Sequence, residues 1–528
     1  MVFFDFLYLP TELAKPPPME NSTIILVVMI VYMVLLIGWG LYQGRKVKTA
    51  SDFAIAGRKL PGWVAALSER ATGESSWALL GLPGAAYATG LMEVWTAIGC
   101  VVGIIVAWVV IAKRLQKEAD KYEADTFTGY IAKRHGSAAK WIRLVGSVTI
   151  VFFFFFYVGA QFLGGGKTLN TLFDINQNWA MLLVVFLVIP YTIYGGFRSV
   201  TYTDVIQSIL MIVTLILAPI AGYFYLINRT ADFGIYATTV GEALEKAGPE
   251  YSTMTGGAVV NPESALGQVL TQWFPNAPDM VAGLGSGIMI AVAFSWFFGY
   301  LGGQPQLSMR FMAIRSAKEA KVARNIGVIW TVIAYTGALF IGWIGIAIFG
   351  PDGLEDQETV MPMVLTEIFP PVVSGILITG VLAAIISTAN SLLILSATEL
   401  SENLIKPFSK KGSETQSLNR SRLITAALSV IALLLAYVTP SDLIYSIVGY
   451  VWAGIGSTFS VVILLTLFWK PYHGKAVLLT MISGLAFTLI WIGSGLDEVI
   501  SSRIMTFVMA LLTAIVATKV TKVEPNTD

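Results

Sequence analysis

Thirteen long apolar runs divide this chain, and they restrict it to folds that cross a membrane. A bilayer-spanning helix needs about 20 mainly apolar residues, whereas membrane strands are shorter and alternate between apolar and polar side chains. The runs are continuous and show no such alternation, so each is predicted to be a transmembrane helix. The predicted spans are about 23–43, 62–87, 91–112, 144–165, 177–195, 202–228, 281–304, 325–350, 371–400, 423–439, 442–469, 476–494 and 504–521.

Composition agrees with a lipid-embedded protein and narrows its function. Charged residues make up 13% of the 528 residues, about half the ~25% that is usual in soluble domains. The net charge of +1 offers no basic surface for nucleic acid, so the lipid bilayer is the expected partner. Cys100 is the only cysteine, and His135 and His473 lie in separate loops, which argues against a disulfide and against a cysteine or histidine metal site.

Motifs of hydrolases and nucleotide-driven pumps are missing from the sequence. There is no HExxH or GxSxG pattern. The segment 164–168 ends like a phosphate-binding loop, but the first glycine that such a loop requires would fall at Gln161. We therefore expect a secondary transporter rather than an enzyme, with no organic cofactor.

The distribution of lysine and arginine predicts the orientation. If thirteen spans alternate, 28 of the 34 basic residues fall on one side, five fall on the other, and Arg70 lies within a span. Basic loops are retained in the cytoplasm. The prediction is a plasma (inner) membrane protein whose N-terminus is outside and whose C-terminus is cytoplasmic.

Span 62–87 breaks the lipid-compatible pattern most severely. It contains Glu69, Arg70 and Glu74, followed by Ser75 and Ser76. A charge at membrane depth costs at least about 2.5 kcal/mol and usually faces a cavity or a partner. The segment therefore predicts an unwound helix that lines a polar cavity, with Glu69 and Arg70 as pathway charges. The alternative is an Arg70–Glu74 pair that only neutralises itself.

Span 281–304 is the second interrupted segment, because it is rich in glycine and ends at Gln304 and Pro305. Each interrupted span begins a series of five, which is the pattern of an inverted-repeat transporter. We expect two repeats, at 62–228 and 281–469. The flanking parts are 1–61 with the first span, an external segment 229–280, and two C-terminal helices with a tail at 470–528.

Three further places carry polar groups at membrane depth. Ser387, Thr388 and Ser391 lie within one turn of span 371–400 and offer hard oxygen ligands for a small cation; hydroxyls that bond their own helix are the alternative. Asp204 stands at the start of span 202–228, where a helix cap is the alternative. Tyr157 ends an aromatic run that otherwise reads as core or lipid-facing.

Four motifs together resemble the sodium:solute symporter family, and within it the sodium/proline symporter branch. They are AGRKLPGWVAALS with SSWALLGLPGAAY, YGGFRSVTYTDVIQ, WFFGYLGGQPQLSMRFMA and LAAIISTANSLL, in the order of that family and within about 51–469. The resemblance implies an all-α membrane protein of about thirteen helices, with two inverted five-helix repeats and broken first helices, which is the LeuT-like fold. It also implies sodium as the coupling ion.

The resemblance also implies site residues. It assigns sodium to the carbonyls of Ala71, Glu74 and Ala384 and to the hydroxyls of Ser387 and Thr388. A possible second sodium would use Asp204 with Ser387, Asn390 and Ser391. The solute would contact Trp77, Tyr157, Trp296 and Tyr300, near Gln304 and Pro305, with Ser75 and Ser76 in the unwound segment.

These observations favour sodium-coupled symport of a small amino acid, with proline first. The branch has an aspartate at the position of Gly73 and a small residue at that of Arg70, so alternatives stay open. One alternative is another solute, such as a different amino acid, a betaine, a carboxylate or a sugar acid, and an anion is favoured if Arg70 faces the cavity. A second alternative is coupling to protons through Glu74. A third is that the chain is a transporter-like membrane sensor.

Overall fold

The computed structural model describes residues 19–229, 234–255, 265–275, 278–406, 414–438 and 443–521, and these residues are almost entirely helical. The helices of the first half are α1 (Met19–Gly44), α2 (Ala50–Ile55), η2 (Ala56–Arg58), α3 (Gly62–Ser76), η3 (Trp77–Gly81), α4 (Leu82–Thr89), η4 (Gly90–Glu93), α5 (Val94–Val106), η5 (Ala107–Ile111), α6 (Ala112–Lys121), α7 (Phe127–Arg134), η6 (Gly136–Ala138), α8 (Ala139–Phe173), α9 (Gln177–Ile227), α10 (Val240–Ala247) and α11 (Pro249–Ser252). Those of the second half are α12 (Ala265–Trp273), α13 (Pro278–Phe294), α14 (Trp296–Tyr300), α15 (Pro305–Ala313), α16 (Ala317–Phe349), η8 (Gln357–Thr359), α17 (Val360–Ile368), α18 (Pro371–Thr398), η9 (Glu399–Ile405), α19 (Glu414–Val438), α20 (Ile444–Val451), η11 (Trp452–Ser457), α21 (Thr458–Phe468), α22 (Gly474–Gly493), η12 (Leu496–Glu498) and α23 (Ser502–Val520).

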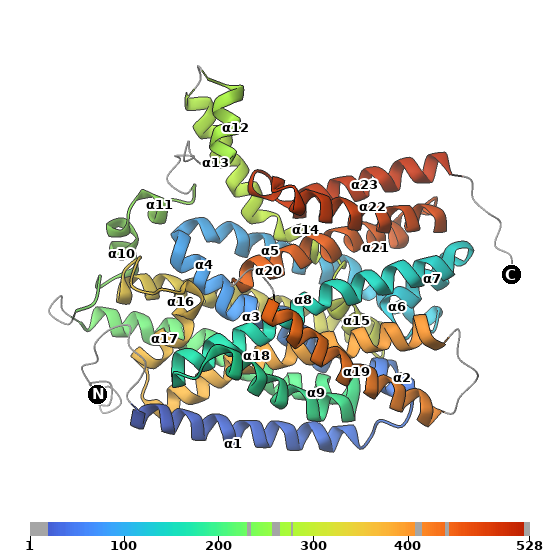
Figure 1. Ribbon diagram of the computed structural model, residues 1–528, viewed down its shortest axis with the longest axis horizontal. Helices are drawn as coiled ribbons and strands as arrows, with labels where there is room; N and C mark the ends of the chain where they lie inside the picture. The colour runs from blue at the N-terminus through green and yellow to red at the C-terminus, as the bar shows by residue number, and fades with distance from the viewer. Residues whose placement is uncertain are drawn as a thin grey trace.

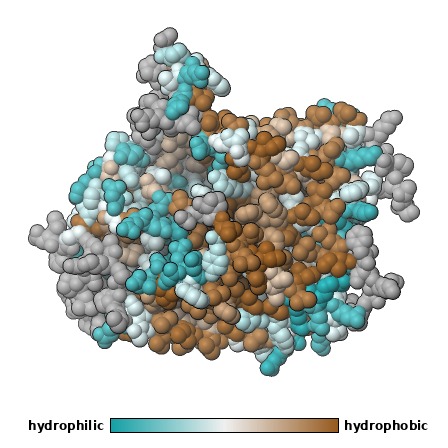
Figure 2. Space-filling view, in the orientation of Figure 1, coloured by the Kyte–Doolittle hydropathy of each residue, from teal (hydrophilic) through white to brown (hydrophobic). Residues whose placement is uncertain are grey.

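Helices long and apolar enough to cross a membrane account for twelve of the thirteen predicted spans, and a shorter apolar helix corresponds to the remaining one. Within the described residues there are 11 such helices, and one of them, Gly62–Lys121, is 60 residues long and holds both 62–87 and 91–112. The shorter apolar helix Gln177–Pro190 corresponds to the run at 177–195. Figure 2 shows hydrophobic side chains over a broad part of the bundle, with hydrophilic ones gathered toward its ends. The prediction of an all-α integral membrane protein is confirmed.

Short helices from the two predicted sets of loops lie at opposite ends of the bundle. Figure 1 shows the short helices α2, α6 and α7 at one end, and α10 and α11 at the other. This separation is the one that the distribution of lysine and arginine predicts. Within the predicted external segment 229–280, the polar stretch around Glu242–Lys246 forms α10. The two chain ends, 1–18 and 522–528, lie outside the described residues, so their predicted sides stay predictions.

Both interrupted spans are broken where the sequence predicts. In α3 the backbone leaves the helical region at Ser75, with φ 54° and ψ −167°. In the second interrupted span the helix stops after α14 and resumes at α15, with Gly302 at φ 80° between them. Positive φ is costly for serine, so Ser75 is held there by its surroundings. Each break leaves backbone N–H and C=O groups without helical partners inside the bundle.

Helix α9 contains a kink at the paired glycines Gly195 and Gly196. It runs for 51 residues and joins the spans predicted at 177–195 and 202–228, with a kink at Gly196 (φ 54°). A Cβ at Gly196 would collide with the ring of Phe53 from α2. Glycine is therefore required there both by the backbone conformation and by the close approach of α2.

Helix α18 occupies the centre of the bundle and presents the predicted ion ligands. Every residue from Leu377 to Thr398 is buried. The helix packs against α3, α8 and α9, so it meets the broken first helix directly. A helix that is apolar all round and enclosed by others has a fixed rotation, which decides where its few hydroxyls point.

Candidate functional site

The four aromatic residues predicted to contact solute meet in one buried cluster, here called the aromatic box. Trp77, just after the α3 break, stacks on Trp296, just before the second break, with ring centroids 4.2 Å apart and planes 6° apart. Tyr157 from α8 and Tyr300 from α14 both lie edge-on to Trp452, at 5.5 and 5.3 Å. The two interrupted helices therefore contribute facing indoles to one site.

Several members of the aromatic box were not predicted from the sequence. The rings of Tyr335, Tyr445 and Trp452 lie 6.1, 6.1 and 6.5 Å from Trp77. Arg503 of the last described helix, α23, places its guanidinium 4.7 Å from the ring centre of Trp296. These residues come from α16, α20, η11 and α23, and nothing local in those apolar runs distinguishes them from ordinary core residues. Arg503 is the exception, because it is one of only five basic residues that fall on the predicted external side of the membrane.

Polar contacts from α8 hold the α3 break in place. The Tyr157 hydroxyl donates to Ser75 Oγ at 3.1 Å. The side-chain oxygen of Gln161 accepts the backbone N–H of Ser76 at 3.0 Å, where the second half of the helix begins. One side chain thus steadies the strained residue and the other satisfies a freed donor. Of the two serines predicted in the unwound segment, Ser75 leaves the helical region, whereas Ser76 already has helical dihedrals (φ −62°, ψ −28°).

Unpaired polar atoms surround the aromatic box. Within the described residues, Ser76 Oγ, Trp77 Nε1, Gln304 Nε2 and Trp452 Nε1 are buried and have no hydrogen-bond partner. Buried polar groups are normally paired, and an unpaired one costs about 1–3 kcal/mol. These unpaired groups beside aromatic rings are therefore available to hydrogen-bond a small polar solute.

The predicted sodium ligands on α18 face the α3 break. Thr388 donates its hydroxyl proton to the carbonyl of Thr72 at 3.0 Å, and Ser387 donates to Asp204 Oδ1 at 2.7 Å. Each hydroxyl therefore has its proton engaged and its lone pairs available for a cation. Ala71, Glu74 and Ala384, whose carbonyls complete the predicted set, are also fully buried. Neither hydroxyl donates to a carbonyl of α18 itself, so the alternative that these hydroxyls only bond their own helix does not apply to Ser387 and Thr388.

The residues predicted for a second sodium separate into two groups. Asp204 and Ser391 both contact the guanidinium of Arg310, at 3.3 and 2.5 Å. Asn390 instead accepts a hydrogen bond from Thr192 of α9. Asp204 lies inside α9 and contacts other helices through its side chain, so it does not act as a helix cap. Arg310 was counted among the loop arginines, whereas the structure buries it completely in α15.

The charges of span 62–87 form a buried network in which Glu74 Oε2 alone lacks a hydrogen-bond partner. The Arg70 guanidinium donates to both carboxylate oxygens of Glu69, to Glu74 Oε1 at 2.9 Å and to Thr331 Oγ1 at 3.0 Å. Glu69 also accepts from Trp108 Nε1 at 3.1 Å. Arg70 is therefore occupied by its own neighbours. A Cβ at Gly73 would lie 3.3 Å from Arg70 Nη2, so an aspartate there would join this network.

A second ion-pair cluster lies beside the aromatic box. Lys167 of α8 pairs with Asp356 at 2.7 Å and with Glu358 at 2.8 Å. Glu358, in the loop segment η8, accepts the backbone N–H groups of Ile444 and Tyr445 at the start of α20. Burial raises the pKa of the Glu358 carboxyl, and the neighbouring Lys167 opposes that rise. The cluster joins α8, η8 and the helix that carries Tyr445.

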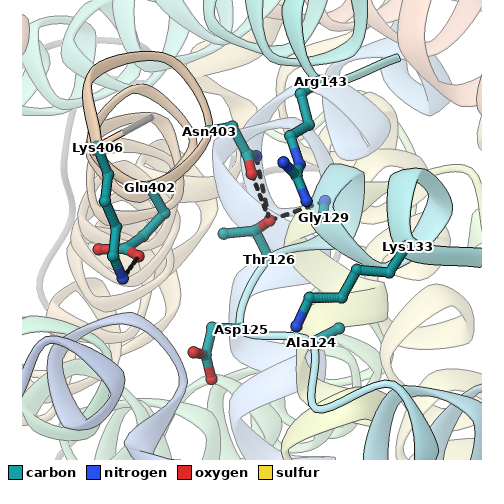
Figure 3. A pocket seen from close by; sticks show the side chains of 9 residues that line it. All are labelled: Ala124, Asp125, Thr126, Gly129, Lys133, Arg143, Glu402, Asn403 and Lys406. Atoms are coloured by element: carbon teal, nitrogen blue, oxygen red, sulfur yellow. Dashed lines mark hydrogen bonds and ion pairs between the residues drawn. The ribbon is translucent and has the colours of Figure 1, made fainter. Parts of the chain in front are cut away.

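A polar pocket of about 350 Å³ near α7 lies apart from this site. Figure 3 shows Asn403 hydrogen-bonded to Thr126 and the Lys406 ammonium paired with Glu402. Lys133 donates to two backbone carbonyls of the loop before α7. Most of the lining charges are satisfied by the protein itself, and none of the predicted site residues lines it.

Sequence comparisons place the chain among known transporters. The pattern of the sodium:solute symporter family matches residues 53–484. The high-affinity proline transporter PutP of Bacillus subtilis (strain 168) is 34% identical over 484 residues, covering 90% of this chain and 94% of that protein. The osmoregulated proline transporter OpuE of the same organism is 32% identical over 494 residues, covering 92% of each. Sodium/proline symporter 2 of Staphylococcus saprophyticus is 32% identical over 495 residues, covering 92% and 89%.

Solved structures show the same fold. A Na+-coupled sialic acid symporter in a substrate-bound, outward-open state superposes with a TM-score of 0.71 at 17% identity, covering 94% of this chain and 98% of that chain. Mhp1, a nucleobase-cation-symport-1 family transporter, superposes with a TM-score of 0.51 at 11% identity, covering 88% and 94%. The fold is therefore the LeuT type that the family resemblance implies. With its family pattern and its relatives in agreement, the chain is a sodium-coupled solute transporter, not an enzyme, and it belongs to the sodium:solute symporter family.

Proposed function

We propose that this chain takes up a small amino acid, with proline as the first candidate, in symport with sodium by alternating access. Relatives at 34% and 32% identity are named as proline transporters, which supports this substrate class. The observation that carries the proposal is the aromatic box, in which Trp77 and Trp296 meet from the two broken helices. An apolar ring packs well against indole faces, while unpaired donors beside them suit a charged or polar end.

Sodium and solute share the broken segment of α3 in this mechanism. Sodium would bind the lone pairs of Ser387 and Thr388 with the predicted carbonyls of Ala71, Glu74 and Ala384. That contact fixes the end of the first half of α3 and, through Ser75, the orientation of Trp77. Solute then binds a site that is already ordered, so the two ligands bind cooperatively. This arrangement supports tight coupling without direct contact between ion and solute.

The membrane potential and the sodium gradient together supply enough free energy to accumulate the solute inside the cell. One positive charge that moves inward across 100 mV releases about 2.3 kcal/mol. A tenfold sodium gradient adds about 1.4 kcal/mol, and the sum of about 3.7 kcal/mol holds a solute gradient of roughly 500-fold. This direction requires the orientation proposed from the basic loops, with the N-terminus outside, the C-terminus in the cytoplasm and the chain in the plasma (inner) membrane. The two repeats would then be 62–228 and 281–469.

Reconstituted uptake tests the function directly. Purified protein in proteoliposomes is expected to accumulate labelled proline only when sodium is higher outside, at the same pH on both sides. A panel of other amino acids, a betaine, a carboxylate and a sugar acid distinguishes the substrate. Uptake driven by a proton gradient without sodium would instead support coupling through Glu74. Absence of any uptake, with capture of a protein partner, would support a sensor.

The role of Arg70 is separable from solute binding. Arg70→Met is expected to destabilise the protein by about 3–5 kcal/mol, because it leaves buried Glu69 and Glu74 without their partner. Adding Glu69→Gln and Glu74→Gln removes the unpaired charges and is expected to restore most of the stability. Thermal unfolding in detergent checks both variants. A stable Arg70→Met protein that has lost only solute affinity would show that Arg70 contacts the solute and would favour an anion.

A further inference from the structure

Arg503 contacts the aromatic box but forms no ion pair with any carboxylate of the described residues. Its guanidinium lies 4.7 Å from the ring centre of Trp296. Nε donates to Ser295 Oγ at 2.8 Å, and Nη2 donates to the backbone carbonyl of Val292 at 3.3 Å. These acceptors are neutral. They fix the position of the guanidinium, and they leave its permanent positive charge unbalanced.

The buried basic side chains near the two helix breaks are already neutralised. Arg70, Lys167 and Arg310 each form an ion pair with one or two carboxylates of the protein. None of the three can bind a further carboxylate without sharing or losing its own partner, which is unfavourable in a buried place. Arg503 differs from them because no such partner has to be displaced.

Part of the Arg503 guanidinium is free to bind a ligand. Arginine carries five N–H donors, and the contacts with Ser295 and Val292 use two of them. Nη1 makes no hydrogen bond within the described residues. Gly449 of α20 leaves the room that Nη1 occupies, because a Cβ at that position would lie 2.7 Å from Nη1. The remaining donors on Nη1 and Nη2 form the fork that suits the two oxygens of a carboxylate.

The indole that Arg503 covers is also held in place. Trp296 Nε1 donates to the hydroxyl of Tyr445 at 3.2 Å, and that hydroxyl donates to Glu93 Oε1 at 3.0 Å. The opposite partner of the indole is Trp77, which stacks on it. A guanidinium anchored against a fixed ring is a pre-organised cation, so a ligand that binds it orders little else.

We propose that Arg503 binds the carboxylate of the transported solute and selects for solutes that carry one. The carboxylate contacts the guanidinium, and the apolar part of the solute packs on the aromatic box beside it. A specificity-determining residue is thus contributed by α23, near the end of the chain. The inference rests on the proposed function, because it names the chemical group of that solute which this residue recognises.

Competition between proline and prolinamide tests this role in the wild-type protein. Prolinamide keeps the ring and the amine but replaces the carboxylate by a neutral amide. Displacement of labelled proline from purified protein in detergent, at saturating sodium, is expected to show prolinamide binding at least about tenfold more weakly. If the uptake panel identifies another amino acid as the better solute, that amino acid and its amide take their places. Equal affinity for the acid and the amide would overturn the proposal.

The failure of this proposal is distinguishable from the failure of the proposed function. Sodium-dependent uptake of only a solute without a carboxylate would overturn the role of Arg503 and leave sodium symport intact. Absence of sodium-dependent uptake for every solute of the panel would overturn the proposed function itself.

Removal of the charge separates contact with the solute from general support of the site. Arg503→Gln is expected to weaken proline binding at least about tenfold and not to weaken prolinamide binding. An equal loss for both ligands would show that Arg503 only positions Trp296, and unchanged proline affinity would show that it has no role. Either result would overturn the proposal. Arg229→Gln is the matched control, because that guanidinium lies 4.3 Å from the ring centre of Tyr225, which is not part of the aromatic box.

A steric variant covers the case in which Arg503→Gln does not fold. Gly449→Ala adds a Cβ 2.7 Å from Nη1 and 3.9 Å from Trp296 Cζ2. Nη1 is the far end of a flexible side chain, so the guanidinium shifts while its charge and the backbone of α20 are kept. Gly449→Ala is expected to weaken proline binding more than prolinamide binding, and the same change for both ligands would contradict the proposal.

Discussion

Replacing both hydroxyls of the predicted sodium site, Ser387→Ala with Thr388→Ala, is expected to raise the sodium concentration for half-maximal uptake at least tenfold. The reason is that two of the five predicted ligands disappear while the backbone carbonyls remain. A tenfold loss corresponds to about 1.4 kcal/mol, which is modest for two oxygen ligands of a buried cation. Uptake measured over a range of sodium concentrations at saturating solute gives the result.

A hydroxyl on the same helix provides the control for this double variant. Thr379 is buried in α18 but bonds the carbonyl of Gly375 in its own helix at 2.8 Å, away from the α3 break. Thr379→Val is therefore expected to leave the sodium dependence unchanged. If Ser387→Ala with Thr388→Ala also shows the wild-type dependence, the ion site lies elsewhere.

Trp77→Ala is expected to weaken solute binding by at least about 30-fold, equivalent to about 2 kcal/mol or more. The indole is fully buried and stacks on Trp296 at 4.2 Å, so its loss opens one wall of the aromatic box. The effect should fall on the solute concentration for half-maximal uptake more than on the sodium dependence. Direct binding of labelled proline to purified protein measures it.

Two further variants separate this role from general damage to the fold. Trp77→Phe keeps an aromatic face and is expected to recover most of the affinity. Trp179→Ala removes an indole that is 66% exposed on α9 and is expected to have no effect on solute binding. Native affinity in Trp77→Ala would exclude the residue from the solute site.

Much of the fold was predictable because the bilayer imposes strong rules on sequence. A span must be long, apolar and internally hydrogen-bonded, so thirteen runs and their alternation can be counted without tertiary information. Departures from those rules are conspicuous for the same reason. The breaks at Ser75 and near Gly302 were therefore expected from glycine, proline and charge alone, and the structure has both.

Partners across the bundle were not predictable in the same way. In lipid, the exposed and the packed faces of a helix are both apolar, so a run such as that containing Tyr335 or Trp452 gives no sign of its rotation. These two rings join the aromatic box only because α16 and η11 turn them inward. Arg503 likewise contacts the ring of Trp296 from α23, near the end of the chain.

The sequence by itself determined that this chain is a membrane protein, predicted thirteen spans and located the segments that break inside the bundle, because solvent and backbone hydrogen bonding dictate these features. It also singled out Asp204 and the hydroxyls of α18 as polar groups at depth. Only the tertiary structure decided what those groups contact. Arg310, counted as a loop charge, turns into the bundle because α3, α9 and α18 converge on the end of α15 and offer a carboxylate and three hydroxyls. A buried charge is stable only where such partners meet, and that meeting is a property of the packing of distant helices.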